Sequence, residues 1–491
     1  GFDERLIGAF ARTPQEMAPL GAYLAERMPP RVMPPGEVTS YSNHGLALAG
    51  YIVEVVSGMP FEQYVAANIL APLEMTQSSF AQPLPPALRD DLSVPYPRDL
   101  DPGPMFYAAI APAGMLSTTA QDMAHFLIAH VQNGRYGDAQ ILDEATAALM
   151  HQRQFSNHPD VPGWAYGFTE RTENGQRVLD HGGADPAGFG SMLVLLPEHN
   201  MGFFVVTNTR FRDEVLMAFS EVLLDYLYPG EPLLPGDPPP LPGSEARAAR
   251  VSGTYITNRH ARHTIGKLSL LTAPPVRVQP AEGDAGMLMV TGLGDETEPS
   301  RWMELEPLLY QHAASEARIA FREDESGQIT DVFARGHTPG AFDKAAWYEN
   351  PRLHQVLVGV CMLIFLTVAI GWPPAGLVRR LRNGATQSVP AVQQARGVAL
   401  GVSVLSPLFL VLLTVLTGAY PLQFGVPVGL RVLFVVPLLV TAMTLALPFL
   451  GARAWSEDWT VLGRLHYASV TVAAFAFIWF LHMWNLLGFR F

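Results

Sequence analysis

Two short stretches of the sequence combine residue types that can transfer protons and bind a carbonyl group. The first is Tyr41-Ser42-Asn43, directly before an apolar run, and the second is His181-Gly182-Gly183, at the end of a strand-like segment. A tyrosine has a pKa near ~10, so it accepts a proton at neutral pH only beside a positive charge. An asparagine amide offers both donors and an acceptor. Taken alone, Tyr41 also fits a turn residue packed on the core, and His181 fits a structural histidine.

The sequence around both stretches resembles the serine β-lactamase and penicillin-binding-protein-like hydrolases, in particular their class C-like branch. The likeness covers Ser40–Gly50, Phe61-x-x-Tyr64-Val65, Leu70-Ala71-Pro72-Leu73-x-Met75, Pro112–Thr119 and Asp180–Met192. In that family a Tyr-x-Asn element supplies proton transfer and a substrate contact, and a Lys/His-Thr/Gly-Gly element lies on the strand that edges the cleft. The resemblance therefore implies an α+β fold, an antiparallel sheet flanked by helices.

The resemblance also implies a role for each of these residues. Tyr41 would be the proton shuttle, Asn43 would hold a substrate carbonyl, and His181 would assist when it is protonated. The expected substrate and oxyanion contacts are Gly182, Gly183 and Ala184. A histidine in place of the commoner lysine is similar to the esterase-like and peptidase-like branches, which argues against a specific β-lactamase.

A third element of that family, the nucleophile-bearing Ser-x-x-Lys, is absent from the printed sequence. The chain has two lysines, Lys267 and Lys344, and the residues three positions before them are Thr264 and Ala341. The opening Gly1-Phe2-Asp3-Glu4 resembles the tail of the stretch that follows the nucleophile. We therefore expect the first part of the hydrolase domain to lie upstream, and this chain alone to be inactive. The rival interpretation is a pseudo-enzyme.

Other catalytic signatures are missing from the sequence. It contains no Gly-x-Ser-x-Gly elbow, His-Glu-x-x-His, P-loop or cysteine pair. His260 and His263 form a His-x-x-His pair beside Arg259 and Arg262, without acidic or cysteine companions, so a surface cluster is the better interpretation than a metal site. We expect no metal and no cofactor. The single Cys361 excludes an intrachain disulfide.

Composition divides the chain into an acidic part and a basic, apolar part. The 491 residues suffice for about three domains, and 49% of them are hydrophobic. Residues 351–491 contain nine arginines and two acidic residues, a net +7, whereas the whole chain carries −13. The remainder is thus strongly acidic, which argues against a nucleic-acid partner. A basic, apolar C-terminal part fits a lipid bilayer.

Residues 1–228 read as the remainder of the hydrolase domain. The run His44–Ser57, capped by Ser42 or Asn43, is apolar nearly all round, which is typical of a buried helix. Strands are expected at Arg177–His181, Ser191–Leu196 and Phe203–Thr207. A helix over Asp213–Leu227 should pack on this sheet through an apolar stripe: Val215, Leu216, Phe219, Val222, Leu223 and Tyr226.

Residues 229–244 are a proline-rich linker, with seven prolines between Pro229 and Gly243. Residues 245–350 show short strand signals separated by turns, which indicates an antiparallel barrel or sandwich. One of the expected strands is Leu268–Thr272. Gly253-Thr254-Tyr255 and Phe321-Arg322-Glu323-Asp324 resemble the lipocalin-like domain often fused behind such hydrolases. Substrate gating and structural support remain open as its roles.

Residues 351–491 contain four apolar stretches long enough to cross a bilayer: 355–372, 397–420, 432–450 and 465–488. The first and third connections carry most of the arginines, which predicts that both are cytoplasmic. The hydrolase and β domains would then lie on the extracytoplasmic side. His482 and Asn485 fall near the outer end of the last stretch, as interfacial residues.

The sequence as a whole predicts a membrane-anchored, exported serine hydrolase that cleaves an amide or ester through an acyl-serine. Its substrate would be a small molecule or a peptide, such as a D-amino-acid peptide, a cell-wall peptide, a β-lactam or a small ester. The alternative is a non-catalytic, membrane-tethered binding or sensor protein on the same fold. The sequence gives no protein partner.

Overall fold

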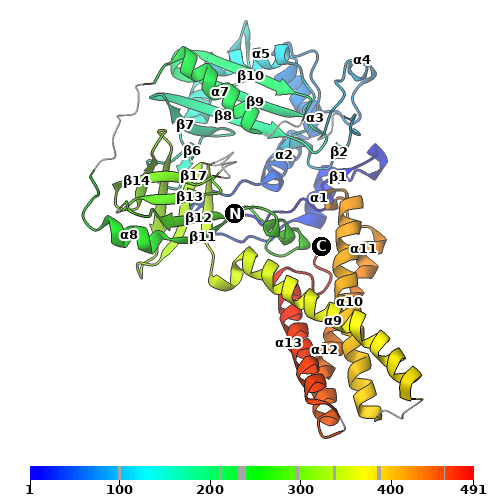
Figure 1. Ribbon diagram of the computed structural model, residues 1–491. Coiled ribbons are helices and arrows are strands. Elements are labelled where there is room, and N and C mark those ends of the chain that lie inside the picture. Colours follow the sequence, from blue (N-terminus) through cyan, green and yellow to red (C-terminus); the bar gives the residue numbers. More distant parts are fainter. Residues whose placement is uncertain are drawn as a thin grey trace. The chain divides into compact units, whose positions relative to one another are not determined.

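The computed structural model describes residues 1–97, 101–209, 213–230, 239–284, 286–293, 298–335, 339–383, 389–457 and 459–491 (Figure 1). The predicted linker therefore lies partly outside the described residues, at 231–238, as does part of the first connection between spans, at 384–388. The chain forms two compact units. The first combines Gly1–Glu4, Ala9–Arg259 and Pro274–Ala345, and the second combines Arg5–Gly8, His260–Ala273 and Ala346–Phe491.

A six-stranded antiparallel sheet forms the centre of the N-terminal domain, in the order β10-β9-β8-β7-β6-β5. Its strands are Phe155–Ser156 (β5), Gly163–Trp164 (β6), Thr169–Glu173 (β7), Gln176–Ala184 (β8), Gly190–Leu196 (β9) and Met201–Thr207 (β10). The predicted strand ending at His181 thus continues through both glycines to Ala184. Two small sheets accompany it, made of Phe10–Ala11 (β1) with Tyr107–Ala108 (β2), and Arg135–Tyr136 (β3) with Ala139–Gln140 (β4).

Helices cover both faces of this sheet, because successive side chains of a strand point to opposite faces. One face packs against α5 (Ala120–Val131) through Met123, Leu127, Leu179, Leu193 and Leu195. The other packs against α7 (Asp213–Leu227) through Val178, Val194, Leu216 and Leu224 (Figure 1). The short helices of this domain are Pro14–Glu16 (η1), Leu20–Arg27 (α1), Phe61–Val65 (α3), Ala66–Leu70 (η2), Pro86–Arg89 (α4), Ala111–Ala113 (η3), Glu144–His151 (α6) and Pro197–His199 (η4).

The stripe predicted to bury α7 was only partly right. Leu216 and Leu224 are the buried leucines of this helix. Val215, Val222 and Tyr226 are 50–82% exposed and face away from the sheet, whereas Phe219 is 49% exposed and its ring contacts that of Phe203 on β10. The helix is apolar on more than one side, and periodicity could not tell which side meets the sheet.

Helix α2 (Asn43–Ser57) is likewise not buried all round, as its composition had suggested. Its core-facing side is made of small or polar residues, and Gly50 approaches Pro112 so closely that a Cβ there would lie 2.3 Å from Pro112 Cγ. Its larger apolar residues face outward: Leu46, Ile52, Val55 and Val56 are 45–82% exposed. Close approach of this helix to the core thus requires small residues, and the bulky ones are left outside.

The β domain is a closed barrel of eight antiparallel strands connected in sequence order, the up-and-down arrangement that lipocalins also have. Its strands are Gly253–Thr257 (β11), Val276–Pro280 (β12), Leu288–Thr291 (β13), Ser300–Glu306 (β14), Leu309–His312 (β15), Arg318–Glu323 (β16), Ile329–Arg335 (β17) and Pro339–Lys344 (β18). Side chains fill the interior, with Tyr255, Trp302, Tyr310 and Phe321 among them. Helix α8 (Ser244–Val251) packs on the same core.

One predicted strand of this domain was wrong. Residues of Leu268–Thr272 belong to the 3-10 helix η5 (Ile265–Leu271), in which Thr264 caps the first turn. The short apolar run is ambiguous by periodicity, and Ile265 and Leu270 are buried.

The barrel and the N-terminal domain pack directly on each other within the first unit. Val161 and Val38 share an apolar cluster with Leu309, Ala320, Phe333 and Ala341 of the barrel. At its exposed edge Arg318 Nη1 lies 3.3 Å from Asp160 Oδ1. The barrel is therefore fixed to the domain that carries the two predicted site stretches.

The second unit contains the four long apolar helices. Their candidate membrane-spanning parts are Pro351–Trp372, Pro390–Ala419, Val428–Ala454 and Val461–Met483. The helices themselves are Pro351–Asn383 (α9), Pro390–Ala419 (α10), Val428–Leu433 (α11), Val435–Ala454 (α12) and Val461–Met483 (α13), with the short turns Trp347–Glu349 (η6) and Leu422–Phe424 (η7). Each of the four candidate membrane-spanning parts is long enough to cross the hydrocarbon core of about 30 Å.

The last helix ends at Met483, earlier than predicted, because the chain then turns back toward other segments of this unit. Asn485 has a left-handed backbone conformation, and its amide Nδ2 donates to the carbonyls of Arg262 and Thr264, at 2.9 Å each. The amide of Ile265 in turn donates to the carbonyl of Arg490 at 2.8 Å. Residues 260–273, which interrupt the barrel sequence after β11, are thus held by the C-terminal segment.

Candidate active site

The structure brings the two predicted site stretches together. The rings of Tyr41 and His181 have centroids 6.2 Å apart, at an interplanar angle of 40°. The ring of Trp164, on β6, lies 6.1 Å from that of Tyr41. The two motifs that sequence reasoning singled out therefore line one location, at the end of β8 and the start of α2.

The start of α2 fixes Tyr41 and Asn43 through local hydrogen bonds. Ser42 is the N-cap, and its Oγ accepts a hydrogen bond from the amide of Gly45 at 3.0 Å. Tyr41 is thus the last residue before the cap, and Asn43 is the first residue of the helix. Within the described part of the chain, no hydrogen bond occupies the side-chain amide of Asn43. Asn43 is therefore available to bind a carbonyl.

The segment before Tyr41 is held by two side chains from other parts of the first unit. Asn157 accepts from the amide of Thr39 at 2.9 Å and donates to its hydroxyl at 2.8 Å. Asn258, from the barrel, donates to the carbonyl of Thr39 at 2.7 Å. The position of Tyr41 thus depends on both domains of this unit.

Strand β8 has an open edge from His181 onward. Its pairing with β7 ends at Asp180, which lies opposite Thr169, whereas its pairing with β9 continues to Ala184. Gly182, Gly183 and Ala184 are exposed. An extended substrate backbone can add to such an unpaired edge through main-chain hydrogen bonds.

The direction of the backbone groups along this edge follows from Asp180. The carbonyl of Asp180 accepts a hydrogen bond from the hydroxyl of Thr169 at 3.2 Å, so it points toward β7. In an antiparallel strand this direction alternates from residue to residue. The N–H and C=O groups of Gly182 and Ala184 consequently point to the same side, beyond the end of β7, where no neighbouring strand uses them.

Burial sets the protonation of both rings. It raises the pKa of Tyr41, while the guanidinium of Arg259 opposes this rise and the carboxylate of Glu4 adds to it. Burial also lowers the pKa of His181, against the smaller opposing effects of the Asp180 carboxylate and a hydrogen bond with the Gly182 backbone. The imidazole of His181 is therefore favoured in its neutral form at neutral pH.

Two charged residues at this location were not recognised from the sequence. The guanidinium carbon of Arg259 lies 4.4 Å from the centroid of the Tyr41 ring. Its Nε donates to Glu4 Oε2 at 3.0 Å. Arg259 follows a barrel strand, and the sequence showed it only as a neighbour of a histidine pair, so no local pattern indicated this contact.

Residues 8–224 match the family model described as Beta-lactamase. This part of the chain is a member of the serine β-lactamase and penicillin-binding-protein-like family. The match contains both site stretches and ends before the barrel begins.

Several known proteins are similar to this β-lactamase-family domain. "Penicillin-binding protein 4" of Amycolatopsis lactamdurans is 29% identical over 240 residues, which are 45% of this chain and 60% of that protein. "Protein flp" of Staphylococcus aureus is 24% identical over 177 residues, 35% of this chain and 34% of that protein. The chain thus spans less than two thirds of the length of either relative.

Solved structures with similarity to the chain include that of SurE, with a TM-score of 0.44 at 19% identity, covering 69% of this chain and 77% of SurE. The octameric penicillin-binding protein homologue from Pyrococcus abyssi gives a TM-score of 0.37 at 19% identity, with 68% of this chain and 70% of that chain covered.

A buried ionic group lies behind the open edge of the β-lactamase-family sheet. Arg171 Nε donates to Asp180 Oδ2 at 2.8 Å, and both side chains are at most 5% exposed. Arg171 also pairs with Glu173. Since Asp180 precedes His181 on β8, this group joins β7 to β8 directly beside the predicted site.

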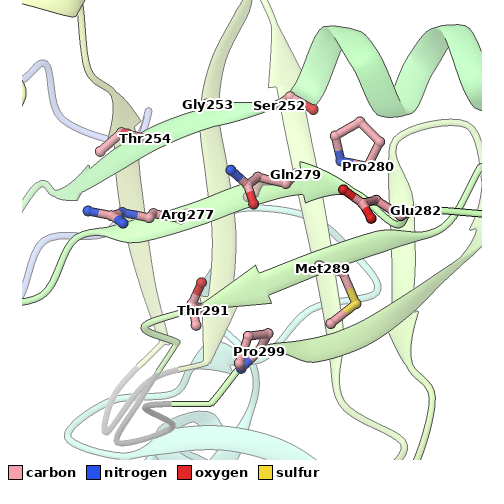
Figure 2. A pocket seen from close by; sticks show the side chains of 11 residues that line it. Ser252, Gly253, Thr254, Arg277, Gln279, Pro280, Glu282, Met289, Thr291 and Pro299 are labelled. Carbon is pink, nitrogen blue, oxygen red and sulfur yellow. The ribbon is translucent and has the colours of Figure 1, made fainter.

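The barrel carries a separate cavity of about 840 Å³, lined by residues of β11, β12 and β13 and by their flanking loops (Figure 2). The side chains of Arg277, Gln279, Met289 and Thr291 line it, and none of the predicted site residues does. The described residues contain no group of three or more histidine, cysteine or acidic side chains arranged to hold a metal ion.

Proposed function

We propose that this chain forms the substrate-binding and proton-transfer part of a membrane-anchored serine hydrolase that cleaves an amide or ester through an acyl-serine. The observation that carries the proposal is the meeting of Tyr41 and His181 at the open edge of β8. The domain limits that we propose are those inferred from the sequence: 1–228, 229–244, 245–350 and 351–491.

Burial favours the neutral imidazole of His181, which disfavours the assistance expected from its protonated form, and each of the other site residues has a role in this reaction. Tyr41 takes the proton from the serine hydroxyl as that oxygen attacks the substrate carbonyl, and it returns the proton to the leaving group. Asn43 donates to a substrate carbonyl. The backbone of Gly182 pairs with the substrate, Gly183 has no side chain to hinder its approach while its own backbone groups face β9, and the N–H of Ala184 stabilises the oxyanion. Water then attacks the acyl-serine, and Tyr41 accepts the proton of water and returns it to the serine oxygen as the acid product leaves.

We propose that a serine outside the printed sequence supplies the nucleophile. The absence of Ser-x-x-Lys from these 491 residues supports this, since the family's reaction requires it. The outward apolar sides of α2 and α7 also support it, because soluble domains rarely leave large apolar residues together in water. A segment that carries the serine and packs on these helices would cover them.

We also propose that the protein spans the cell membrane several times, with the β-lactamase-family domain and the barrel on the extracytoplasmic side. The basis is the arginine count of the connections between the apolar helices. Arg453 and Arg464 lie in the third connection, whereas Arg431 is the only basic residue of the second. Side-specific protease digestion of intact cells would test this arrangement.

The test of the proposed function is covalent labelling of the natural, full-length protein with a fluorescent β-lactam or a fluorophosphonate, followed by mass spectrometry. We expect an adduct on a serine outside the printed sequence. In the full-length protein, Tyr41→Phe should lower turnover by about 10²-fold or more, because general acid–base catalysis contributes about that much. Unchanged melting of Tyr41→Phe would show that folding is intact, and near-wild-type turnover would refute the role of Tyr41.

The missing nucleophile also favours a second candidate function, a non-catalytic binding or sensor protein on the same fold. This candidate predicts no adduct with either label. It also predicts that a peptide or small ester binds to the site with an affinity that Tyr41→Phe changes little.

A further inference from the structure

The barrel places a permanent positive charge beside the tyrosine of the β-lactamase-family site. Arg259 directly follows Asn258 after the end of β11, and its guanidinium carbon lies 4.4 Å from the centroid of the Tyr41 ring. An arginine stays protonated at every physiological pH. It therefore supplies the kind of charge that a tyrosine needs in order to accept a proton.

Three contacts hold Arg259 in this position. The side chain of Asn258, which is 4% exposed, donates to the carbonyl of Thr39 at 2.7 Å. The backbone amide of Asn258 donates to the carbonyl of Ala341 on β18 at 2.9 Å, which ties the residue to the barrel. Finally, Glu4 Oε2 accepts from Arg259 Nε at 3.0 Å. The arginine is thus held through Asn258, the residue before it, and through its own guanidinium.

We propose that Arg259 is a positioning residue of the Tyr41 site, and that the barrel is part of the catalytic unit because it delivers this residue. The proposal rests on the proposed function. The guanidinium acts through Tyr41: it favours the negatively charged phenolate oxygen, and the phenolate is the form that accepts the serine proton. The sequence left substrate gating and structural support open as roles of the barrel. In this proposal the barrel instead contributes a side chain that acts on Tyr41.

Among the charged and titratable groups around Tyr41, Arg259 is the one that stabilises the phenolate form. Glu4 is negative and opposes the phenolate, and its side chain is 16% exposed. His181 is the second titratable ring in contact, and its burial favours the neutral imidazole. Arg259 is therefore the positive group that faces the tyrosine among the described residues of the first unit.

The expected size of the effect is about tenfold. The guanidinium carbon lies 4.4 Å from the centroid of the Tyr41 ring, and charges a few ångströms apart still interact at the effective dielectric constant of a protein surface. The side chain of Arg259 is 38% exposed and Glu4 partly neutralises it, so water and the carboxylate reduce this interaction. We expect Arg259→Ala to raise the pKa of Tyr41 by about 1, which is a tenfold change in the fraction of phenolate.

The first measurement is independent of catalysis. Tyrosine labelled with carbon-13 at Cζ is incorporated into the chain, the Tyr41 signal is assigned by its loss in Tyr41→Phe, and its titration is followed by NMR. Arg259→Ala should move the titration of Tyr41 to higher pH, Arg259→Lys should restore most of the difference, and Glu4→Gln should move it to lower pH. A Tyr41 titration that is the same with and without Arg259 would overturn the proposal.

A matched control comes from the same barrel surface. Arg318 is 40% exposed and pairs with Asp160 of the β-lactamase-family domain, as Arg259 pairs with Glu4, but Arg318 has no contact with Tyr41. Arg318→Ala should leave the titration of Tyr41 unchanged. An equal shift in Arg318→Ala would mean that any lost inter-domain ion pair disturbs the tyrosine, and would overturn a specific role for Arg259.

The second measurement uses the full-length protein with an ester or peptide substrate. The pH profile of kcat should shift upward by about one pH unit in Arg259→Ala, with kcat at pH 7 about tenfold lower and KM little changed. A raised KM with an unshifted profile would show that Arg259 only binds substrate and would refute the proposal. Full activity of Tyr41→Phe would refute the proposed function instead, while the NMR titration would still decide how Arg259 and Tyr41 are coupled.

Discussion

A buried pair of histidines should make the β-lactamase-family domain sensitive to acid. His130, on α5, and His151, the last residue of α6, are joined by a hydrogen bond of 3.1 Å between Nδ1 and Nε2. His130 is 3% exposed and packs against Phe126 and Phe168. Burial, with a smaller effect of His151, lowers the pKa of His130 from 6.5 to about 4. Burial also lowers the pKa of His151, and Arg177 adds to that effect.

The size of the effect follows from the two pKa values of His130. Below about pH 6.5 the unfolded chain binds a proton at this histidine while the folded chain does not, so stability falls as the pH falls. The loss is complete near pH 4, where both states are protonated, and above pH 6.5 the histidine has no effect. At 1.36 kcal/mol for each unit of pKa, the loss attributable to His130 is about 3 kcal/mol.

Hydrogen exchange of α5 measured by mass spectrometry gives the free energy of local opening in the full chain, after correction for intrinsic rates. Between pH 7 and pH 4 the opening free energy should fall by about 3 kcal/mol more in the wild type than in His130→Gln. His158→Gln, at a half-exposed loop position, is the matched control and should behave as the wild type. If the difference in opening free energy between the wild type and His130→Gln stayed constant from pH 7 to pH 4, the reasoning would be refuted.

Two further changes test the contacts around the site and in the second unit. Arg171→Met leaves the buried Asp180 carboxylate without its cation and should lower the unfolding free energy by about 3–5 kcal/mol. The double variant Arg171→Met/Asp180→Leu removes both charges and should recover part of this loss. Equal losses in the single and double variants would contradict this account. Asn485→Leu removes the donor to the carbonyls of Arg262 and Thr264 and should speed hydrogen exchange in residues 260–273 while that of α5 stays unchanged; unaltered exchange in 260–273 would contradict it.

Local signals in the sequence were sufficient for much of the fold. The cap of α2 was expected at Ser42 or Asn43, and it is Ser42, whose Oγ accepts from the amide of Gly45 three residues ahead. The strands β9 and β10 were expected within a residue or two, because apolar runs flank a turn that begins with Pro197. The four apolar helices were recognised because a spanning segment requires an uncharged stretch of fixed length.

The errors and omissions arise where distant segments meet. Periodicity showed that α2 and α7 are apolar, but it could not show which side meets the core, since both carry apolar residues on several sides. The contact between Glu4 and Arg259 joins residues 255 positions apart, and no local pattern reports it. Tyr41 and His181 were assigned to one site through a family resemblance, whereas their surroundings, including Trp164, became visible only in the folded chain.

The second unit has a consequence for the order of events during synthesis. It combines residues from both ends of the chain: the Nη2 of Arg5 donates to the carbonyl of Phe491 at 3.2 Å, and the amide of Gly8 donates to the carbonyl of Leu422 at 3.1 Å. At 5–20 residues per second, a ribosome needs roughly 25 to 100 s to separate two such residues. Sheets and helices form in far less time. The β-lactamase-family sheet can therefore fold well before Arg5–Gly8 finds its partners, and this segment must stay accessible until Leu422 and Phe491 have been synthesised. During synthesis, Arg5–Gly8 is therefore the segment that stays open to a chaperone for the longest time.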